Sequence, residues 1–327
     1  MKTMRALLFD KGSVKFRGDY PAPEFDPVRS PDVALVRVLC AGVCATDLEI
    51  SKGYMGFEGV LGHEFSGVVE ECGDDRMEGR RVTGEINLWC GKCAFCKGGM
   101  KNHCPQRSVL WILGKDGAFA DYLTLPVRNL HPLPDSITDE EGVFVEPLAA
   151  AFQITAQLDI RPHERIAVLG DGRLGQLCAQ VLSLTECDLT VIGNHPEKLA
   201  LLKARGIKTA IGTDGLAKGF DMAVDCTGSP DGFNAALGLV RPGGVVVLKT
   251  TVADRTVADL NRVVIDEITV IGSRCGPFIP AIEALSEKRV DVAPLISKIF
   301  PLEQGVEALE YAAQKGVLKV VLRVGDR

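Results

Sequence analysis

Four cysteines lie close together in the segment CGKCAFCKGGMKNHC. Their spacing, Cys-x2-Cys-x2-Cys-x7-Cys, places four soft ligands in a stretch too short to enclose a hydrophobic core of its own. Four thiolates at tetrahedral reach suit zinc, and a complete set of four leaves no open coordination position for a substrate. We therefore predict a closed, structural zinc site with the ligands Cys90, Cys93, Cys96 and Cys104.

Two other uses of the same thiols are open on the sequence alone. The cysteines would form disulfides in an oxidising compartment, or would bind an iron–sulfur cluster. Nothing in the neighbouring residues indicates electron transfer, and the chain has the character of a cytoplasmic protein, so zinc is favoured. We interpret His103, which adjoins the last cysteine, as a bystander rather than a ligand.

A second set of metal-binding residue types is spread more widely along the chain. The segments GVCATDLEI, LGHEF and VEPLAA supply a thiol, an imidazole and two carboxylates. One thiolate, one imidazole and one carboxylate can hold zinc with a position left for water or substrate. Each of these residue types alone is commoner as a core or surface residue than as a ligand. Together they predict an open zinc site with the candidate ligands Cys44, His63, Glu64 and Glu146.

The segment GDGRLG has the spacing Gly-x-Gly-x-x-Gly and follows an all-apolar run, RIAVL. In a strand–turn–helix unit such glycines permit a tight turn and the close approach of a pyrophosphate, which binds the amides of the helix N-terminus. The alternative is a glycine-rich turn without a ligand, because the motif alone is weak. We predict a dinucleotide site that includes Gly170, Gly172, Arg173, Leu174 and Gly175.

The choice between NAD and NADP depends on the end of the next expected strand, LTVIG. This strand ends on Gly193, where NAD-binding folds carry an acidic residue for the adenosine ribose. Without that carboxylate a 2′-phosphate is not repelled, and nearby side chains offer it donors. NADP is therefore favoured over NAD, although the residues after Gly193 would equally well only turn the chain. The candidate residues are Gly193, Asn194, His195 and Lys198, with Arg173 from the glycine turn.

Two patterns of secondary structure position these groups. The first 150 residues contain short predicted strands interrupted by Pro and Gly, which is typical of a barrel-like β domain. After them, buried apolar strands alternate with helices, which indicates a parallel sheet covered on both faces. We predict an α/β protein with a β-rich domain over 1–150, completed by about 278–327, and a doubly wound nucleotide-binding domain over 151–277.

Composition limits the possible partners and the compartment. The chain of 327 residues has a formal net charge of −6 and scattered basic residues, which argues against nucleic acid or an anionic membrane as a partner. The N-terminal segment MKTMRALLFDKGSVKF has too short an apolar run for a signal peptide or a membrane span. We therefore expect a cytoplasmic protein, and we interpret most of the isolated cysteines as small core residues.

The motifs together carry a resemblance that covers nearly the whole chain. GVCATDLEI, LGHEFSGVVEECG, the four-cysteine segment, GAFADYLTLP, EPLAA, VLGDGRLGQ and VDCTGS occur in this order. In this arrangement the sequence resembles the zinc-dependent alcohol dehydrogenases of the medium-chain dehydrogenase/reductase superfamily, and most of all the polyol, glucose and threonine dehydrogenase branch. The resemblance implies a GroES-like catalytic domain, a Rossmann domain, and a homodimer or homotetramer.

The same resemblance implies an activity and a set of metal ligands. The activity is hydride transfer between NAD(P) and an alcohol or carbonyl substrate, such as a secondary alcohol, a polyol or a sugar-like molecule. Cys44 and His63 are the implied zinc ligands, and Glu64 or Glu146 supplies the carboxylate. Asp47 matches the acid that orients the ligand histidine and raises its basicity.

The implied proton path begins at Thr46, which matches the hydroxyl that takes the proton from the alcohol. A cap or turn hydroxyl is the alternative role for this residue. Many relatives have a histidine five residues after the ligand cysteine, whereas this chain has Glu49. The outer part of the path would then use Glu49, a ribose hydroxyl or a chain of waters.

Two further groups of residues complete the expected site. VDCTGS and IGSR end predicted strands at the same edge as the glycine turn, so they are expected to border the nicotinamide. Two other functions use the same fold: a lyase or epimerase that retains its cofactor, and a non-catalytic nucleotide-binding protein. The candidate nicotinamide residues are Cys226, Thr227, Gly228, Ser273 and Arg274, and the candidate substrate-pocket residues are Tyr54, Phe57, Trp111 and Phe278.

Overall fold

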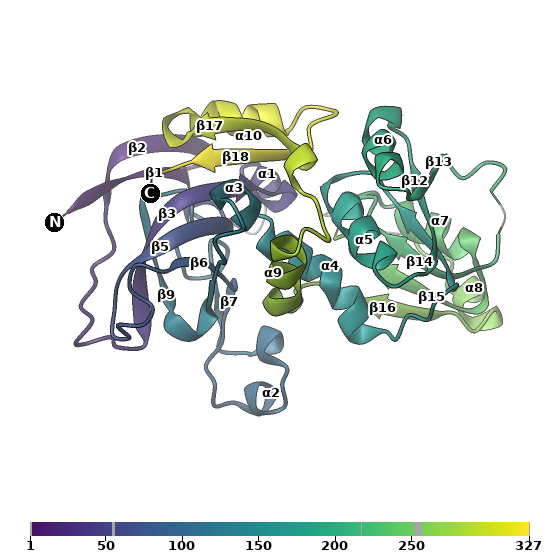
Figure 1. Cartoon of the computed structure of the whole chain (residues 1–327), viewed down its shortest axis with the longest axis horizontal. Coiled ribbons are helices and arrows are strands. Elements are labelled where there is room, and N and C mark those ends of the chain that lie inside the picture. Colours follow the sequence, from purple (N-terminus) through teal and green to yellow (C-terminus); the bar gives the residue numbers. More distant parts are fainter. Residues whose placement is uncertain (1, 54–55, 217, 252–256, 327) are drawn as a thin grey trace. The chain divides into compact units, whose positions relative to one another are not determined.

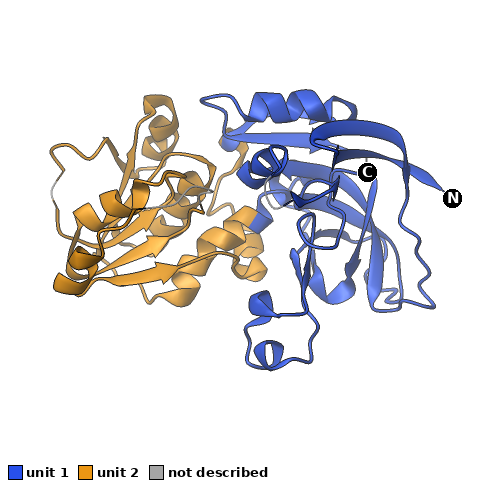
Figure 2. Ribbon diagram, turned by 180° about the vertical axis from the view of Figure 1, so that it is seen from behind, with its two compact units in different colours: residues 1–146, 295–327 blue, residues 147–294 orange. Residues whose placement is uncertain are grey.

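The computed structural model describes residues 2–53, 56–216, 218–251 and 257–326. The chain forms two compact units: unit 1 is Met1–Glu146 with Leu295–Arg327, and unit 2 is Pro147–Pro294 (Figure 2). Residues 278–294, which we had expected in the first domain, are part of unit 2. One reason is that Gln180 exchanges two hydrogen bonds with the backbone of Asp291, at 2.8 and 3.0 Å.

Unit 1 consists mainly of strands (Figure 1). Its largest sheet has the order β10-β6-β5-β3-β18-β17, with β9 also paired to β3, and two smaller sheets have the orders β2-β1-β4 and β7-β8. The elements are β1 (Thr3–Asp10), β2 (Ser13–Pro21), β3 (Val33–Val43), α1 (Ala45–Ile50), β4 (Gly59–Val60), β5 (Glu64–Cys72), β6 (Arg81–Gly84), β7 (Asn87–Leu88), α2 (Ala94–Lys97), β8 (Ser108–Val109), β9 (Tyr122–Pro126), β10 (Leu130–Pro132), α3 (Asp139–Gly142), β17 (Ile296–Pro301), α10 (Gly305–Ala312) and β18 (Lys319–Arg323).

Strand β3 forms the centre of this unit. It alternates half-buried and buried residues from Val33 to Arg37 and is completely buried from Val38 to Val43, as expected for a strand that enters a closed core. It pairs antiparallel with β5, where Gly42 faces Glu64, and with β18, where Val43 faces Val320. Segments far apart in the sequence therefore meet at the end of β3.

Unit 2 is a parallel sheet with the strand order β13-β12-β11-β14-β15-β16. Central strands such as β11 are almost fully buried, which confirms the doubly wound α/β fold expected from their apolar sequences. The elements are α4 (Val145–Gln157), β11 (Arg165–Leu169), α5 (Arg173–Ser183), β12 (Asp188–Gly193), α6 (Pro196–Ala204), β13 (Lys208–Ile211), β14 (Phe220–Asp225), α7 (Gly232–Leu239), β15 (Val240–Leu248), α8 (Leu260–Ile265), β16 (Thr269–Gly272) and α9 (Phe278–Ser286). Within the described ranges, no helix is long and apolar enough to span a bilayer.

Candidate active site

Three of the predicted metal ligands come together in unit 1. Cys44 precedes α1, His63 lies just before β5, and Glu64 is the first residue of β5. Each offers a ligand atom, and these atoms all lie within 4.8 Å of one another. The pairing of Gly42 in β3 with Glu64 in β5 brings the two strand ends together. We call Cys44, His63 and Glu64 the open site.

Asp47 supports two of these ligands at once. Its Oδ2 accepts a hydrogen bond from the backbone N–H of Cys44 at 2.8 Å, which caps the first turn of α1. Its Oδ1 lies 3.6 Å from Nδ1 of His63, and the carboxyl group is fully buried. The side chain therefore stands where an acid would orient the imidazole and leave Nε2 for a metal.

The surroundings of His63 fit a metal site. Its ring stacks on Trp111, with ring centroids 3.6 Å apart and an angle of 12° between the planes. Asp47 Oδ1, His63 Nδ1 and Trp111 Nε1 are buried without hydrogen-bond partners in the described chain. Burial lowers the pKa of His63, but the nearby charge of Asp47, with a contribution from Cys44, outweighs it and raises that pKa well above the usual value. A thiol, an imidazole and a carboxylate with unsatisfied neighbours suit zinc.

A lysine that the sequence did not single out completes this site. Lys319, the first residue of β18, forms a short ion pair with Oε2 of Glu64, and both side chains are at most 3% exposed. Its ammonium also lies 3.4 Å from the carbonyl oxygen of Val43 and 5.5 Å from the centre of the Phe144 ring. A Cβ at Gly42 would come within 2.5 Å of Glu64 Oε2, so only glycine leaves room for this carboxylate.

The other predicted residues of this region take different places. Glu146 is not among the described residues whose ligand atoms group together at the open site. Thr46 Oγ1 lies 3.8 Å from Cys44 Sγ, so its hydroxyl adjoins the ligand set. Glu49 accepts a hydrogen bond from Lys52 at 2.8 Å, and its side chain is 47% exposed. The carboxylate of Glu49 thus already has a cationic partner at the surface.

The four cysteines form the second group, which we call the four-cysteine site. Their ligand atoms lie within 4.8 Å of one another, and the Sγ···Sγ distances of three pairs are 3.4, 3.8 and 4.0 Å. A tetrahedron of thiolates around zinc has edges of about 3.8 Å, whereas a disulfide bond is about 2.05 Å long. Each of the eleven cysteines, all within the described ranges, is a thiol rather than half of a disulfide. The arrangement of the four thiols therefore fits zinc and not a pair of disulfides. His103 is not part of the group.

Glu85 connects the four-cysteine segment to the β-rich core. Its carboxylate accepts hydrogen bonds from Lys101 at 2.7 Å, which lies three residues before Cys104, and contacts Nε2 of His131 in β10 at 3.1 Å. Burial raises the pKa of Glu85, but the hydrogen bonds and charges of His131 and Lys101 outweigh it, so the net effect is a lowered pKa. The segment is therefore held by charge as well as by its own cysteines.

The glycine turn of unit 2 has the geometry of a dinucleotide site. Gly170 has a φ of 109°, and a Cβ there would lie 2.5 Å from the carbonyl oxygen of Cys226. A Cβ at Gly175 would overlap the carbonyl oxygen of Gly170, whereas a Cβ at Gly172 would meet no atom within 4 Å. Two glycines are thus required by the chain itself. The third, Gly172, faces open space at the start of α5, where the backbone can approach a pyrophosphate.

The space expected beside Gly193 is filled. The carboxylate of Asp171, from the variable position of the glycine motif, occupies it, and a Cβ on Gly193 would lie 2.6 Å from Cβ of Asp171. The prediction that no negative charge stands at this strand end is therefore wrong. Asn194 is exposed and His195 half-exposed, whereas Lys198 is buried, with 9% of its surface exposed. Arg173 and Leu174 are the first two residues of α5.

The predicted nicotinamide residues meet at the carboxyl edge of the parallel sheet. Thr227 binds Asp225 through its amide and its hydroxyl, and the amide of Gly228 donates to Thr250. The edge also contains a buried lysine, Lys249, whose ammonium donates at 3.2 Å to the hydroxyl of Ser273 and to the carbonyl oxygen of Arg274. Cys226, which follows β14, adjoins the glycine turn.

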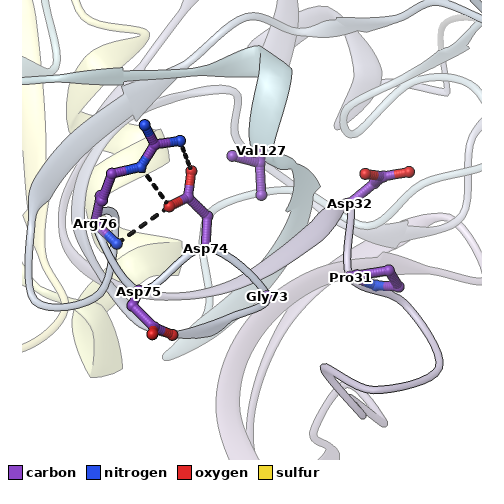
Figure 3. A pocket seen from close by; sticks show the side chains of 7 residues that line it. All are labelled: Pro31, Asp32, Gly73, Asp74, Asp75, Arg76 and Val127. Carbon is purple, nitrogen blue, oxygen red and sulfur yellow. Dashed lines mark hydrogen bonds and ion pairs between the residues drawn. The ribbon is translucent and has the colours of Figure 1, made fainter.

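The expected substrate-pocket residues are only partly placed. Trp111 lies against His63, Phe57 is buried in unit 1, and Phe278 is buried at the start of α9 in unit 2. Tyr54 lies outside the described residues. A surface pocket of about 580 Å³ in unit 1 is lined by Asp32, Asp74, Asp75 and Arg76 among others, and Arg76 is paired with Asp74 (Figure 3). None of the predicted site residues lines it, so we assign it no role.

Comparison with protein families matches both parts of the chain. Residues 30–135 match the alcohol dehydrogenase GroES-like domain, and residues 174–288 match the zinc-binding dehydrogenase domain. Among curated proteins, a sorbitol dehydrogenase of Halalkalibacterium halodurans is 28% identical over 91% of this chain and 93% of its own length. The first family match contains the open site and the four-cysteine site, and the second begins at the end of the glycine turn, at Leu174.

Solved structures agree with this result. The alcohol dehydrogenase of Thermus sp. ATN1 is similar over 98% of this chain and 100% of its own, with a TM-score of 0.88 and 27% identity. A putative zinc-binding dehydrogenase of Sinorhizobium meliloti, solved with bound NADP, is similar over 99% of this chain and 100% of its own, with a TM-score of 0.87 and 25% identity. The similarity therefore extends over both units.

Proposed function

Because the chain belongs to the zinc-dependent alcohol dehydrogenase family of the medium-chain dehydrogenase/reductase superfamily, and is an NAD(P)-dependent oxidoreductase of its polyol dehydrogenase-like branch, we propose that its chemistry takes place at the open site. The observation that carries this proposal is the convergence of Cys44, His63 and Glu64 within 4.8 Å, with Asp47 buried behind them. The geometry favours Glu64 over Glu146 as the carboxylate ligand.

The residues of the open site have separate tasks in oxidation of an alcohol. Cys44, His63 and Glu64 hold the metal, and Asp47 fixes the imidazole. When bound, zinc would supply Lewis acidity toward the substrate oxygen, and the nicotinamide would supply an acceptor for the hydride of the carbinol carbon. Thr46, whose hydroxyl lies 3.8 Å from Cys44 Sγ, accepts the hydroxyl proton and passes it outward. In carbonyl reduction the same proton returns through Thr46.

The outer part of the proton path avoids Glu49 in this proposal. Glu49 already binds the ammonium of Lys52 at the surface, so its carboxylate is occupied by a cationic partner. A ribose hydroxyl of the cofactor or a chain of waters is then the route from Thr46 to solvent. The four-cysteine site holds a second, structural zinc and takes no part in the proton or hydride movement.

We propose NADP as the preferred cofactor, bound at the glycine turn. The pyrophosphate would bind the amides at the start of α5, next to Gly172, with Arg173 at the first helical position. The residues Cys226, Thr227, Gly228, Ser273 and Arg274 would border the nicotinamide. The side chains of Asn194 and His195 are the donors that support binding of the 2′-phosphate, because Lys198 is buried. The negative charge of Asp171, which lies close by, is bound by His195.

Other features of the chain support its proposed oligomeric state and compartment. Helix α8 exposes large apolar side chains, with Leu260, Val264 and Ile265 between 64% and 78% exposed, and β16 is the last strand at one edge of the parallel sheet. Exposed apolar side chains and an open strand edge are both features that association would cover, which supports a homodimer or homotetramer. Eleven cysteines that form no disulfide within the described chain support a reducing compartment such as the cytoplasm.

The proposed function is tested with a panel of secondary alcohols, polyols, sugar alcohols and the corresponding carbonyl compounds, using NAD(H) and NADP(H). We expect a net change in nicotinamide absorbance that requires zinc. Product formed without such a change would replace the dehydrogenase by a lyase or epimerase. The absence of any turnover across the panel in zinc-loaded protein would favour a binding protein.

Two substitutions test the assigned roles. Thr46→Val should lower kcat by about 100-fold or more, whereas Thr46→Ser, which keeps the hydroxyl, should retain most of the rate. Cys44→Ser should remove one zinc per chain together with hydride transfer, and Cys187→Ser, a free thiol outside both metal sites, is the matched control. Equal rates for the two Thr46 variants would contradict the proton path, and full zinc content in Cys44→Ser would contradict the ligand set.

A further inference from the structure

Asp171 brings a carboxylate to the end of β12 from a different element. The acid of an NAD-binding fold is expected on the strand itself, at the position of Gly193. Here Asp171 reaches across from the glycine turn, and its carboxyl carbon would lie 2.7 Å from a Cβ on Gly193. The side chain is 6% exposed. Glycine at position 193 is thus explained by the space that Asp171 needs.

The carboxylate of Asp171 is fully used within the protein. Its Oδ2 accepts the backbone N–H groups of Asn194 and His195, both at 2.8 Å, and its Oδ1 lies 2.9 Å from Nδ1 of the His195 ring. Three donors offset the negative charge, and charge-assisted hydrogen bonds of this length are strong. A carboxylate with these partners is not available to accept hydrogen bonds from ribose hydroxyls.

The position of His195 follows from this arrangement. A carboxylate can only accept, so Nδ1 of the ring is the nitrogen that carries a proton toward Asp171. Nε2 lies on the opposite side of the imidazole, and 41% of the side chain is exposed. His195 also precedes α6, directly after the end of β12, where a dinucleotide-binding fold places the adenosine ribose.

We propose that His195, held in place by Asp171, recognises the 2′-phosphate of NADP. Nδ1 donates to Asp171, and Nε2, on the exposed side of the ring, faces the phosphate, so one ring joins the two groups. Asp171 is a positioning residue, because it contacts the turn and the ring rather than the cofactor. The inference rests on the proposed NADP preference and assigns it to a pair of residues outside the usual strand-end position.

Gln176 strengthens the connection between the glycine turn and the ribose end of the site. Its buried side-chain amide donates to the carbonyl oxygens of Asp171 and Lys198, at 3.2 and 2.9 Å. The glycine motif is therefore linked to the first turn of α6 through Gln176, and to the residues Asn194 and His195 before that helix through Asp171. Movement of the His195 ring relative to the pyrophosphate position is restricted by both links.

The test compares two small probes that differ only in the 2′-phosphate: adenosine 2′,5′-bisphosphate and 5′-AMP. Binding to the full-length, zinc-loaded protein is measured by titration calorimetry, so the result does not depend on turnover. We expect the bisphosphate to bind more tightly to the parent protein. His195→Ala should weaken bisphosphate binding by more than about tenfold and change 5′-AMP binding by less than about twofold. His195→Gln, whose amide can still donate, should recover part of the difference.

Asp171→Asn tests the positioning role. An amide oxygen can replace one carboxylate oxygen only, and the NH2 group then faces a donor, either the two backbone amides or the ring. We expect the preference for the bisphosphate to fall as in His195→Ala, with a changed ¹⁵N chemical shift for the His195 ring. The control is Asp188→Asn, which makes the same change at the start of β12, where Asp188 pairs with Lys208 at the surface.

The outcomes separate this inference from the proposed function. A parent protein that prefers the bisphosphate, with the preference retained in both His195→Ala and Asp171→Asn, would overturn the role of the pair. A parent that binds both probes equally would overturn both the NADP preference and this inference, while hydride transfer with either cofactor would still support the dehydrogenase. Thermal unfolding of every variant shows whether the comparison concerns folded protein, and the His195 variants alone decide the question if Asp171→Asn does not fold.

Discussion

Replacement of Lys319 should destabilise unit 1 because it leaves Glu64 as a buried, unpaired carboxylate. Both side chains are at most 3% exposed, so water cannot replace the lost partner. Breaking a buried ion pair by removing one partner costs about 3–5 kcal/mol. We therefore expect Lys319→Met to lose about 3–5 kcal/mol of unfolding free energy.

The assay is urea unfolding at pH 7 of protein freed of metal by a chelator, and again of zinc-loaded protein. In the zinc-loaded form, Lys319→Met should lower the unfolding free energy by less, because a metal next to Glu64 compensates the negative charge of this carboxylate. Lys298→Met is the control: it removes an exposed lysine of the neighbouring strand β17 whose ammonium lies 4.2 Å from the Phe300 ring, a contact worth about 0.5–1 kcal/mol.

A double substitution distinguishes an unpaired charge from lost packing. Glu64→Leu with Lys319→Met removes both charges, and apolar replacement of a buried pair is often nearly neutral. The double variant should therefore be more stable than either single variant in the metal-free state. A loss below about 1 kcal/mol in Lys319→Met, or a double variant whose loss equals the sum of the two single losses, would refute this reasoning.

Three further predictions concern other parts of the chain. A mild chelator should remove the zinc of the open site and leave the four-cysteine site filled, since an open position exposes its metal; metal analysis that finds one zinc per chain, or equal loss of both, would contradict this. The lowered pKa of Glu85 means that its pairing stabilises the protein above the ordinary glutamate pKa and that this stability is lost as the pH falls through the lower folded-state value. Glu85→Gln should therefore cost more stability at pH 7 than near pH 3 in urea unfolding, and an equal cost at both would show that charge is not involved. Gly193→Asp should lower the melting temperature, because Asp171 fills the space, and Asp171→Gly combined with Gly193→Asp should restore it; a stable single variant would disprove the overlap.

The fold was predictable because its signals are local and periodic. Apolar strands alternating with helices indicate a parallel sheet, and the spacing of glycines in GDGRLG places a tight turn between a strand and a helix. The four-cysteine site was equally accessible, since all its members lie within one short segment. The boundary near residue 278 was not, because it depends on contacts such as that of Gln180 with Asp291, which are 111 residues apart.

Parts of the candidate site depend on contacts that no local pattern contains. The motif Gly-x-Gly-x-x-Gly allows any residue at its second position, so it assigns no role to Asp171. A carboxylate at that position does indicate a contact with the next strand when that strand ends in glycine. Lys319 has no motif at all, and its partner is fixed by the pairing of β18 with β3. The sequence offered Glu64 and Glu146 equally as the carboxylate, and only the geometry of the described chain, which groups Glu64 with Cys44 and His63, favours one of them.

The pairing of β18 with β3 has a consequence for biosynthesis. The ligands of the open site are translated early, but Lys319, which neutralises Glu64, follows 255 residues later. At about 5–20 residues per second, a ribosome needs roughly 13–50 s to cover that interval. During this time Glu64 has no lysine partner and β3 lacks one of its neighbours, while all of unit 2 is synthesised and can fold. Nascent chains should therefore bind nucleotide before they acquire a stable metal site at Cys44 and His63.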